Sequence, residues 1–396
     1  MNTTKTGIII LIKCAITGES LTLPEGFYLQ DAYDEIVRHS IGPMAYTGAA
    51  LCGIPKDDHV MKKLFAIYIK QMMKSEAQMS EAARVFKAFD ENGIDYLPLK
   101  GLNLKGLYPK PELRQMGDAD ILIKEEQYPV IKGIVERLGF EFKYESDHEL
   151  VWINDKLFME LHKHLIPSYN KDYYEYFAKG WQLAWPANTA DSPRHKFKSA
   201  EDEFIFIFTH FAKHYRDGGI GLRHIIDLWV YMNAYPEMDE AYIDAILERL
   251  QLLEFYNNIL GLIDAWFKGG RPNEKTDFIS EYIFSSGNWG GLDAHLLSAI
   301  VKETQTSTAD QEYNKARHIL RRAFPDKEFM VSYFPFLKKC PFVYPVFWPV
   351  RHVHALLFKR DSIKRQWDTY TAVDQINSFE DALAHVGLRF NFKDKD

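Results

Sequence analysis

The stretch from Leu97 to Ile123 reads LPLKGLNLKGLYPKPELRQMGDADILI and carries the strongest indication of the fold. Its last seven residues, GDADILI, place Asp118 and Asp120 two positions apart at the head of an apolar segment. Side chains at positions i and i+2 of a strand share one face, with Cα atoms about 6.6 Å apart at a rise of about 3.3 Å per residue. The two carboxylates are therefore expected to converge on one face of a sheet.

A second acidic segment supplies a third carboxylate. Phe158–His162 (FMELH) alternates as a short strand does, which puts Glu160 and His162 on one face. Oxygen ligands favour Mg²⁺, with Mn²⁺ as the alternative, and two such ions about 3.5–4 Å apart suit an in-line transfer of a phosphoryl or nucleotidyl group. An Asp-x-Asp pattern alone is common in turns, so the strand context carries the prediction. We predict that the catalytic and metal-binding residues are Asp118, Asp120 and Glu160.

Strand and helix patterns alternate around these acids. Short strands are expected at Tyr96–Leu99, Ala119–Ile123, Phe140–Lys143, Val151–Ile153 and Phe158–His162. Helical periodicity lies between them at Leu102–Tyr108 and Glu125–Leu138. The middle third of the chain is therefore α/β in character.

Helical patterns dominate on both sides of this middle third. A long amphipathic run covers Asp57–Asn92 and ends at Gly93. From about Asp172 onward the sheet is not expected to reappear. The later helical patterns are Ser199–Tyr215, Leu222–Met232, Tyr242–Leu253, Phe255–Phe267 and a last one around Phe379–His385.

Composition limits the classes of function. The 396 residues are 46% apolar and carry a net charge of −7, which argues against extended DNA binding. The widely spaced Cys14, Cys52 and Cys340 exclude a cysteine zinc cluster and suit a reducing compartment. The apolar run Gly7–Ile12 is followed by Lys13 and has no cleavage site, so a buried element is expected rather than a signal peptide. We expect a cytoplasmic protein with no transmembrane segment.

The strand before Lys100-Gly101, the helix after it, Arg114 and Asp118-x-Asp120 resemble the uncharacterised nucleotidyltransferase family of the DNA polymerase beta superfamily. The resemblance covers about residues 8–330. Lys-Gly stands where the superfamily has Gly-Ser, and the gap to Asp118 is longer. The resemblance implies an α+β fold with a small polymerase-beta-like sheet and flanking helical regions. The expected divisions are an N-terminal helical region (1–92), a nucleotidyltransferase core (93–170), a helical domain completing the cleft (171–334) and a Pro/aromatic and basic C-terminal extension (335–396).

The same resemblance implies a nucleotide-binding turn. At Lys100-Gly101 a helix N-terminus would direct backbone N–H groups at an anion, and Lys100 would add a positive charge for the triphosphate. The alternative is that Gly101 only permits tight packing and Lys100 is solvated. Arg114 is either a phosphate ligand or a partner that neutralises the acids.

A second polar constellation lies on two later helices. His210 and His214 are four residues apart and share a helix face, and Arg223 and Asp227 do the same on the next helix. The resemblance implies that this pattern closes over the nucleotide, with Lys213 or Arg223 binding phosphate and Asp227 orienting Arg223. The alternative is a structural hydrogen-bond network between packed helices. A zinc protease site is disfavoured because the histidine pair lacks the His-Glu-x-x-His glutamate.

These patterns predict an ATP-binding, metal-dependent nucleotidyltransferase that moves a nucleoside monophosphate from a nucleoside triphosphate to an acceptor hydroxyl. The acceptor, whether a small molecule, RNA or protein, and the oligomeric state are not determined by the sequence. The alternative is a non-catalytic nucleotide-binding regulatory protein on the same scaffold.

Overall fold

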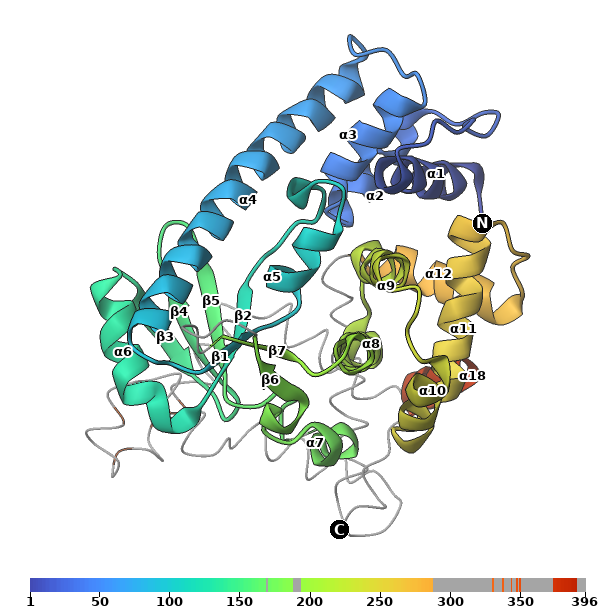
Figure 1. Cartoon of the computed structure of the whole chain (residues 1–396). Coiled ribbons are helices and arrows are strands. Elements are labelled where there is room, and N and C mark those ends of the chain that lie inside the picture. The colour runs from blue at the N-terminus through green and yellow to red at the C-terminus, as the bar shows by residue number, and fades with distance from the viewer. Residues whose placement is uncertain are drawn as a thin grey trace.

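The computed structural model describes residues 1–168, 170–187, 194–287 and 373–389, together with the single positions 330, 337, 343, 347 and 349. Helices surround a mixed sheet in these residues (Figure 1), so the predicted α+β class is confirmed. The extension predicted for 335–396 lies mostly outside the described residues. Among the residues described, no helix has the length and apolar character needed to cross a membrane.

The central sheet has five strands in the order β1-β2-β5-β4-β3. Its strands are β1 (Tyr96–Pro98), β2 (Ala119–Ile123), β3 (Glu141–Glu145), β4 (Glu149–Ile153) and β5 (Phe158–His162). β2 and β5 run parallel, whereas the pairs β1–β2, β4–β5 and β3–β4 are antiparallel. All five predicted strands are thus present, although β4 begins two residues earlier than expected.

Alternation along the strands gives the sheet two chemically different faces. On one face, Ile121, Trp152, Leu161 and neighbouring apolar side chains pack in a core with the C-terminal half of α4 (His59–Glu91) and with α6 (Tyr128–Arg137). The opposite face carries acidic and imidazole side chains at the intervening positions of β2, β4 and β5. Burial of the apolar face fixes the strand register, because a slip of one residue would exchange the two faces.

Four helices precede the sheet, namely α1 (Thr3–Thr17), α2 (Leu29–Arg38), α3 (Gly42–Leu51) and α4. α1 buries the apolar run Gly7–Ile12 as predicted. Asp58 caps α4 by accepting hydrogen bonds from the amides of Val60 and Met61 at 2.8 and 3.0 Å. α4 then runs from α3 to the sheet and so connects the helical part to the core (Figure 1).

Further helices lie on the polar side of the sheet, across from α6 (Figure 1). They are α7 (Lys171–Phe177), α8 (Ala200–Gly218), α9 (Leu222–Ala234), α10 (Glu240–Arg249), α11 (Leu253–Ile263), α12 (Glu274–Ser286) and α18 (Val373–His385). The expectation that no strand follows Asp172 is wrong, because β6 (Ala184–Pro186) and β7 (His195–Phe197) form a second antiparallel sheet. Strands of three residues, one ending in proline, are too short to produce a recognisable alternation.

The α1–α3 interface requires a glycine at position 48. A Cβ atom at Gly48 would lie 2.0 Å from the backbone oxygen of Leu11 on α1. We expect Gly48→Ala to lower the free energy of unfolding by about 1–3 kcal/mol, because the two helix backbones must move apart. Urea denaturation measures the change.

The control for Gly48→Ala is Gly133→Ala in α6, where the new Cβ would meet only the Arg137 side chain at 3.6 Å. Alanine is favoured over glycine in a helix by roughly 1 kcal/mol, so this control should be stabilised. Equal effects of the two substitutions would contradict the close α1–α3 contact.

Candidate functional site

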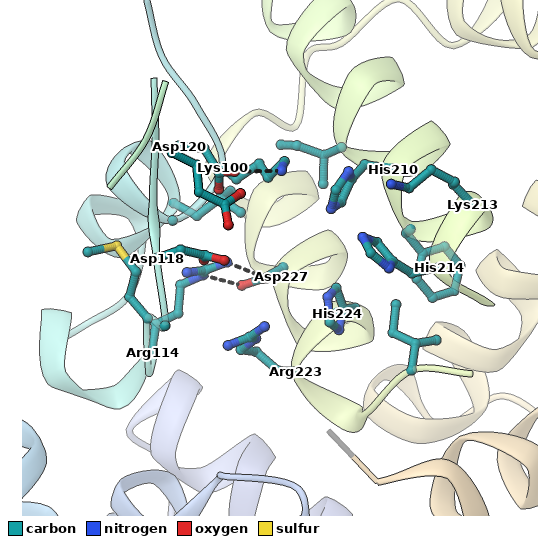
Figure 2. Close-up of a pocket in the computed structure, with 18 of the residues that line it drawn as sticks. Lys100, Arg114, Asp118, Asp120, His210, Lys213, His214, Arg223, His224 and Asp227 are labelled. Carbon is teal, nitrogen blue, oxygen red and sulfur yellow. Dashed lines mark hydrogen bonds and ion pairs between the residues drawn. The ribbon is translucent and has the colours of Figure 1, made fainter. Parts of the chain in front are cut away.

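A cavity of about 470 Å³ lies between the polar face of the sheet and helices α8 and α9. Figure 2 shows acidic side chains from the sheet facing histidines and basic groups from these helices. Every residue predicted for the site lines this cavity: Lys100, Gly101, Arg114, Asp118, Asp120, Glu160, His162, His210, Lys213, His214, Arg223 and Asp227. The structure therefore brings together two motifs that lie about a hundred residues apart in the chain.

The acidic wall is built by strands β2 and β5. Asp120 and Glu160 are register partners in this parallel pair, and Asp118 directly precedes β2. The Oδ1 atom of Asp120 lies 2.7 Å from Nε2 of His162, which is itself 3.6 Å from Oε2 of Glu160. Strand pairing thus places carboxylates from two strands beside one imidazole.

Burial and neighbouring charges give the two aspartates very different pKa values. Desolvation, reinforced by the charges of Asp120 and Glu160, raises the pKa of Asp118 to about 6. Burial also opposes ionisation of Asp120, but Lys100 and His162 outweigh it and hold the pKa of Asp120 well below its usual range. Neighbouring cations therefore balance the negative charge of Asp120, whereas they balance that of Asp118 only in part.

Lys100 lies closer to the acids than the sequence suggested. Its Nζ atom donates a hydrogen bond to Asp120 Oδ1 at 2.9 Å, as Figure 2 shows, and does not extend into solvent. The backbone of Lys100 has φ 44° and ψ −111°, a conformation that costs a non-glycine residue about 1–3 kcal/mol. The helix that follows, α5 (Gly101–Leu104), is a single turn, so its dipole adds little to anion binding.

Arg114 is held by a buried carboxylate on the helical wall. Its Nε and Nη2 atoms donate to Asp227 Oδ1 and Oδ2 at 2.7 and 2.9 Å (Figure 2). Tyr108 also donates to Asp227 Oδ1, at 2.6 Å. We expected Asp227 to orient Arg223, but that prediction is wrong, because both oxygens of the carboxylate bind Arg114 instead. Such bidentate geometry is characteristic of arginine and fixes the guanidinium plane.

Gly101 permits this arrangement. A Cβ atom at Gly101 would lie 2.9 Å from Nη1 of Arg114 and 2.9 Å from both Cγ and Sδ of Met116. The close-packing alternative for Gly101 therefore describes its contacts. A larger residue at position 101 would therefore clash with the Arg114 and Met116 side chains.

The helical wall offers further cationic groups. Arg223 donates from Nη1 to the carbonyl oxygen of Gln115 at 3.1 Å, and its Nε atom is buried with no hydrogen-bond partner among the described residues. Lys213 is 9% exposed and lines the same cavity. Both side chains lie across the cavity from Asp118 and Asp120, as Figure 2 shows.

Histidines cover the remainder of the helical wall. The rings of His210 and His214 are 4.4 Å apart between centroids and meet edge to face. Burial, followed by nearby cations such as Lys100 and Lys213, lowers the pKa of both side chains well below the usual value. Burial and Arg223 likewise lower the pKa of His224 to about 3. These imidazoles are neutral at physiological pH and act as hydrogen-bonding groups rather than as charges.

Three titratable lining residues were missed by the sequence analysis, namely His148, Glu149 and His224. Glu149 starts β4 and is the register partner of His162, so a correct strand start would have identified it. His224 lies beside Arg223 in the motif already noted, although helical spacing from Arg223 favoured Asp227 instead.

Within the residues that the structure describes, two groups of side chains have donor atoms close enough to hold one cation. Asp120, Glu160 and His162 form the first, and His148, Glu149 and His162 form the second, with all donor atoms of a group within 4.8 Å of one another. Asp118 belongs to neither group but lines the same cavity. The donor geometry fits a divalent cation. Burial and, after it, repulsion from Asp120 and Glu160 raise the pKa of Asp118, and a cation would relieve that repulsion.

Comparison with known proteins assigns the chain to a class. A nucleotidyltransferase family model matches residues 27–268, which is more than half of the chain but shorter at both ends than expected. The chain belongs to this family, which is described as uncharacterised nucleotidyltransferase, and the predicted membership is confirmed. No curated protein matches the sequence. A solution structure of the antibiotic-resistance factor ANT(2'')-Ia aligns with 46% of this chain and 98% of its own, at 16% identity and a TM-score of 0.34.

The raised pKa of Asp118 predicts a pH-dependent loss of stability. A carboxyl group whose pKa is about 6 in the folded state and 3.8 in the unfolded state destabilises the fold increasingly as the pH rises from about 4 to 6. Asp118→Asn should therefore stabilise the protein by about 1–3 kcal/mol at pH 7.5, and much less at pH 4. Urea denaturation in chelator-containing buffer at both pH values measures this.

The exposed Asp155, which lies between β4 and β5, provides the control. Asp155→Asn should leave stability unchanged at both pH values. A destabilised Asp118→Asn protein at pH 7.5 would contradict the proposed repulsion.

Proposed function

We propose that this protein transfers a nucleoside monophosphate from a nucleoside triphosphate to an acceptor hydroxyl, with Asp118, Asp120 and Glu160 as the carboxylates that hold magnesium. The observation that carries the proposal is one cavity with carboxylates on its sheet wall and cations on its helical wall. A triphosphate needs both, because divalent cations and basic side chains share the compensation of its charge. Family membership supports the same reaction.

The proposed reaction forms one bond and breaks one. The acceptor oxygen attacks the α-phosphorus in line, the bond between that phosphorus and the bridging oxygen breaks, and pyrophosphate leaves. Bound Mg²⁺ supplies Lewis-acid stabilisation of the charge that develops on the phosphate oxygens. Glu160, with 17% of its side chain exposed, accepts the proton of the acceptor hydroxyl.

The helical wall binds and orients the triphosphate in this proposal. Lys213 and Arg223 contact the β- and γ-phosphates, and the Nε atom of Arg223 gains a partner in doing so. Asp227 keeps the Arg114 guanidinium beside Asp118 and the turn at Gly101. The neutral histidines exclude bulk water from the cavity and offer hydrogen bonds to sugar or phosphate oxygens.

The carboxylates are tested by nucleotide binding with and without Mg²⁺. We expect the Asp118→Asn plus Asp120→Asn protein to lose the Mg²⁺-dependent part of its affinity for a nonhydrolysable triphosphate, a loss of at least about tenfold. Isothermal titration calorimetry measures both affinities. The matched control is Asp155→Asn together with Asp244→Asn, two exposed acids that do not line the cavity. Unchanged Mg²⁺-dependent binding in the site variant would reject the proposal.

Lys100 is predicted to weaken binding of a metal ion alone and to strengthen binding of the metal–triphosphate complex. Its ammonium group competes with a cation for Asp120, and once displaced it is available to the triphosphate. Lys100→Met should therefore tighten binding of Mn²⁺ alone by about tenfold, equivalent to about 1.4 kcal/mol, and weaken binding of the metal–triphosphate complex. Electron paramagnetic resonance measures free Mn²⁺, and calorimetry measures the nucleotide. Two affinities that move in the same direction would contradict this competition.

The Lys100–Asp120 ion pair also favours a second candidate function. A lysine that permanently neutralises Asp120 would leave a nucleotide-binding regulatory protein without turnover. Incubation of a cellular lysate with the protein and a triphosphate labelled at the α-phosphate separates the two functions. Label transferred to any acceptor, and lost with Asp118→Asn, supports the transferase. Binding without transfer supports the regulator.

A further inference from the structure

A second group of metal-binding side chains lies at the β4–β5 edge of the cavity. Glu149 and His162 are register partners in this antiparallel pair, so their side chains stand next to each other on the polar face. His148 comes from the turn that leads into β4, and its Nε2 atom is 3.0 Å from Oε2 of Glu149. The donor atoms of all three residues lie within 4.8 Å of one another.

His162 is the buried member of this group. It is 5% exposed, and its Nε2 atom is fixed by Asp120 at 2.7 Å. Its Nδ1 atom is buried and has no hydrogen-bond partner within the described part of the chain. Histidines that bind metals commonly carry a carboxylate on the other ring nitrogen, which sets the tautomer and the direction of the ring. A buried ring nitrogen without a partner costs free energy that a bound cation would recover.

The other ligands are held in place as well. Tyr144 donates to Glu149 Oε1 at 3.3 Å, and Nδ1 of His148 lies 3.3 Å from both Asp147 Oδ1 and Ser146 Oγ. His148 therefore also has a carboxylate on the nitrogen opposite the one that faces Glu149. Each imidazole of the group therefore has a carboxylate beside one of its ring nitrogens.

We propose that His148, Glu149 and His162 form a binding site for a nitrogen-preferring divalent cation of the Zn²⁺ type. Two imidazoles and one carboxylate are a ligand set that Zn²⁺ takes in sites with an open fourth position. Mg²⁺ instead requires oxygen ligands, so this site selects a different metal from the aspartate cluster. All three residues line the cavity, so a cation held by them would be accessible from it. The inference does not depend on nucleotidyl transfer.

Co²⁺ provides a spectroscopic test, because nitrogen ligands and low coordination number intensify its visible absorption far above that of the hydrated ion. The full-length protein is titrated with Co²⁺ and then with Zn²⁺. We expect one saturable Co²⁺ signal that stoichiometric Zn²⁺ removes and that millimolar Mg²⁺ leaves intact. An absorption no stronger than that of hydrated Co²⁺, or a signal displaced by Mg²⁺, would overturn the proposal.

Variants assign the signal to these residues. His148→Gln and Glu149→Gln should each raise the Kd for Co²⁺ at least about tenfold. His164→Gln is the matched control, because His164 lies two residues beyond His162 and outside both donor groups. Circular dichroism confirms that each variant is folded. Wild-type Co²⁺ binding in both ligand variants would overturn the assignment.

Asp118→Asn separates this site from the proposed function. Asp118 lies outside the donor group, so the variant should keep the full Co²⁺ signal even when it has lost Mg²⁺-dependent nucleotide binding. Loss of the Co²⁺ signal in Asp118→Asn would assign the cation to the aspartate cluster and overturn the proposal. Failure of nucleotidyl transfer in the wild type would leave the Co²⁺ result standing.

Discussion

Repulsion between the buried carboxylates of β2 and β5 is the constraint that the rest of the cavity accommodates. Strand pairing forces Asp120 and Glu160 side by side, and Asp118 adds a third charge. Charges that are shielded from solvent interact more strongly than they do in water. Lys100 and His162 compensate Asp120 directly, whereas Asp118 keeps a raised pKa. A cation bound beside these carboxylates, as proposed, would therefore favour the ionised form of Asp118.

The Arg114–Asp227 ion pair joins the two walls of this cavity. Arg114 comes from the loop before β2, and Asp227 lies on α9, so the pair connects the sheet to the helical part. Buried pairs of this kind contribute more to specificity of arrangement than to net stability, because desolvation offsets most of the attraction. Tyr108 adds a third hydrogen-bonding group to the same carboxylate. The walls are therefore held in one relative position by hydrogen bonds with defined directions.

The sheet and its acidic positions could be predicted from local alternation, whereas the helical residues were assigned to the cavity by the family resemblance. Spacing placed Asp118 with Asp120 and Glu160 with His162, and Asp118-x-Asp120 identified the start of β2. The sequence could not show which groups form ion pairs across the cavity. Asp227 is one turn from Arg223 in the helix but binds Arg114, which comes from a distant loop. Glu149 was missed because its strand starts with charged residues, and β6–β7 because three-residue strands carry no period. Local patterns fix which face a side chain occupies, whereas long-range packing decides which group it meets.

The turn at Lys100 shows how local backbone preference and long-range packing combine. A residue with φ 44° is strained, and glycine would relieve that strain, yet a lysine occupies the position. Its backbone conformation directs the side chain across β2, so that Nζ reaches Asp120 while Gly101 leaves room for Arg114. The ion pair stabilises a conformation that local propensity disfavours by about 1–3 kcal/mol. In the proposed function, a cation that replaces Lys100 at Asp120 would leave the ammonium group available to a bound triphosphate. Binding of the metal and binding of the nucleotide would then be coupled through Lys100.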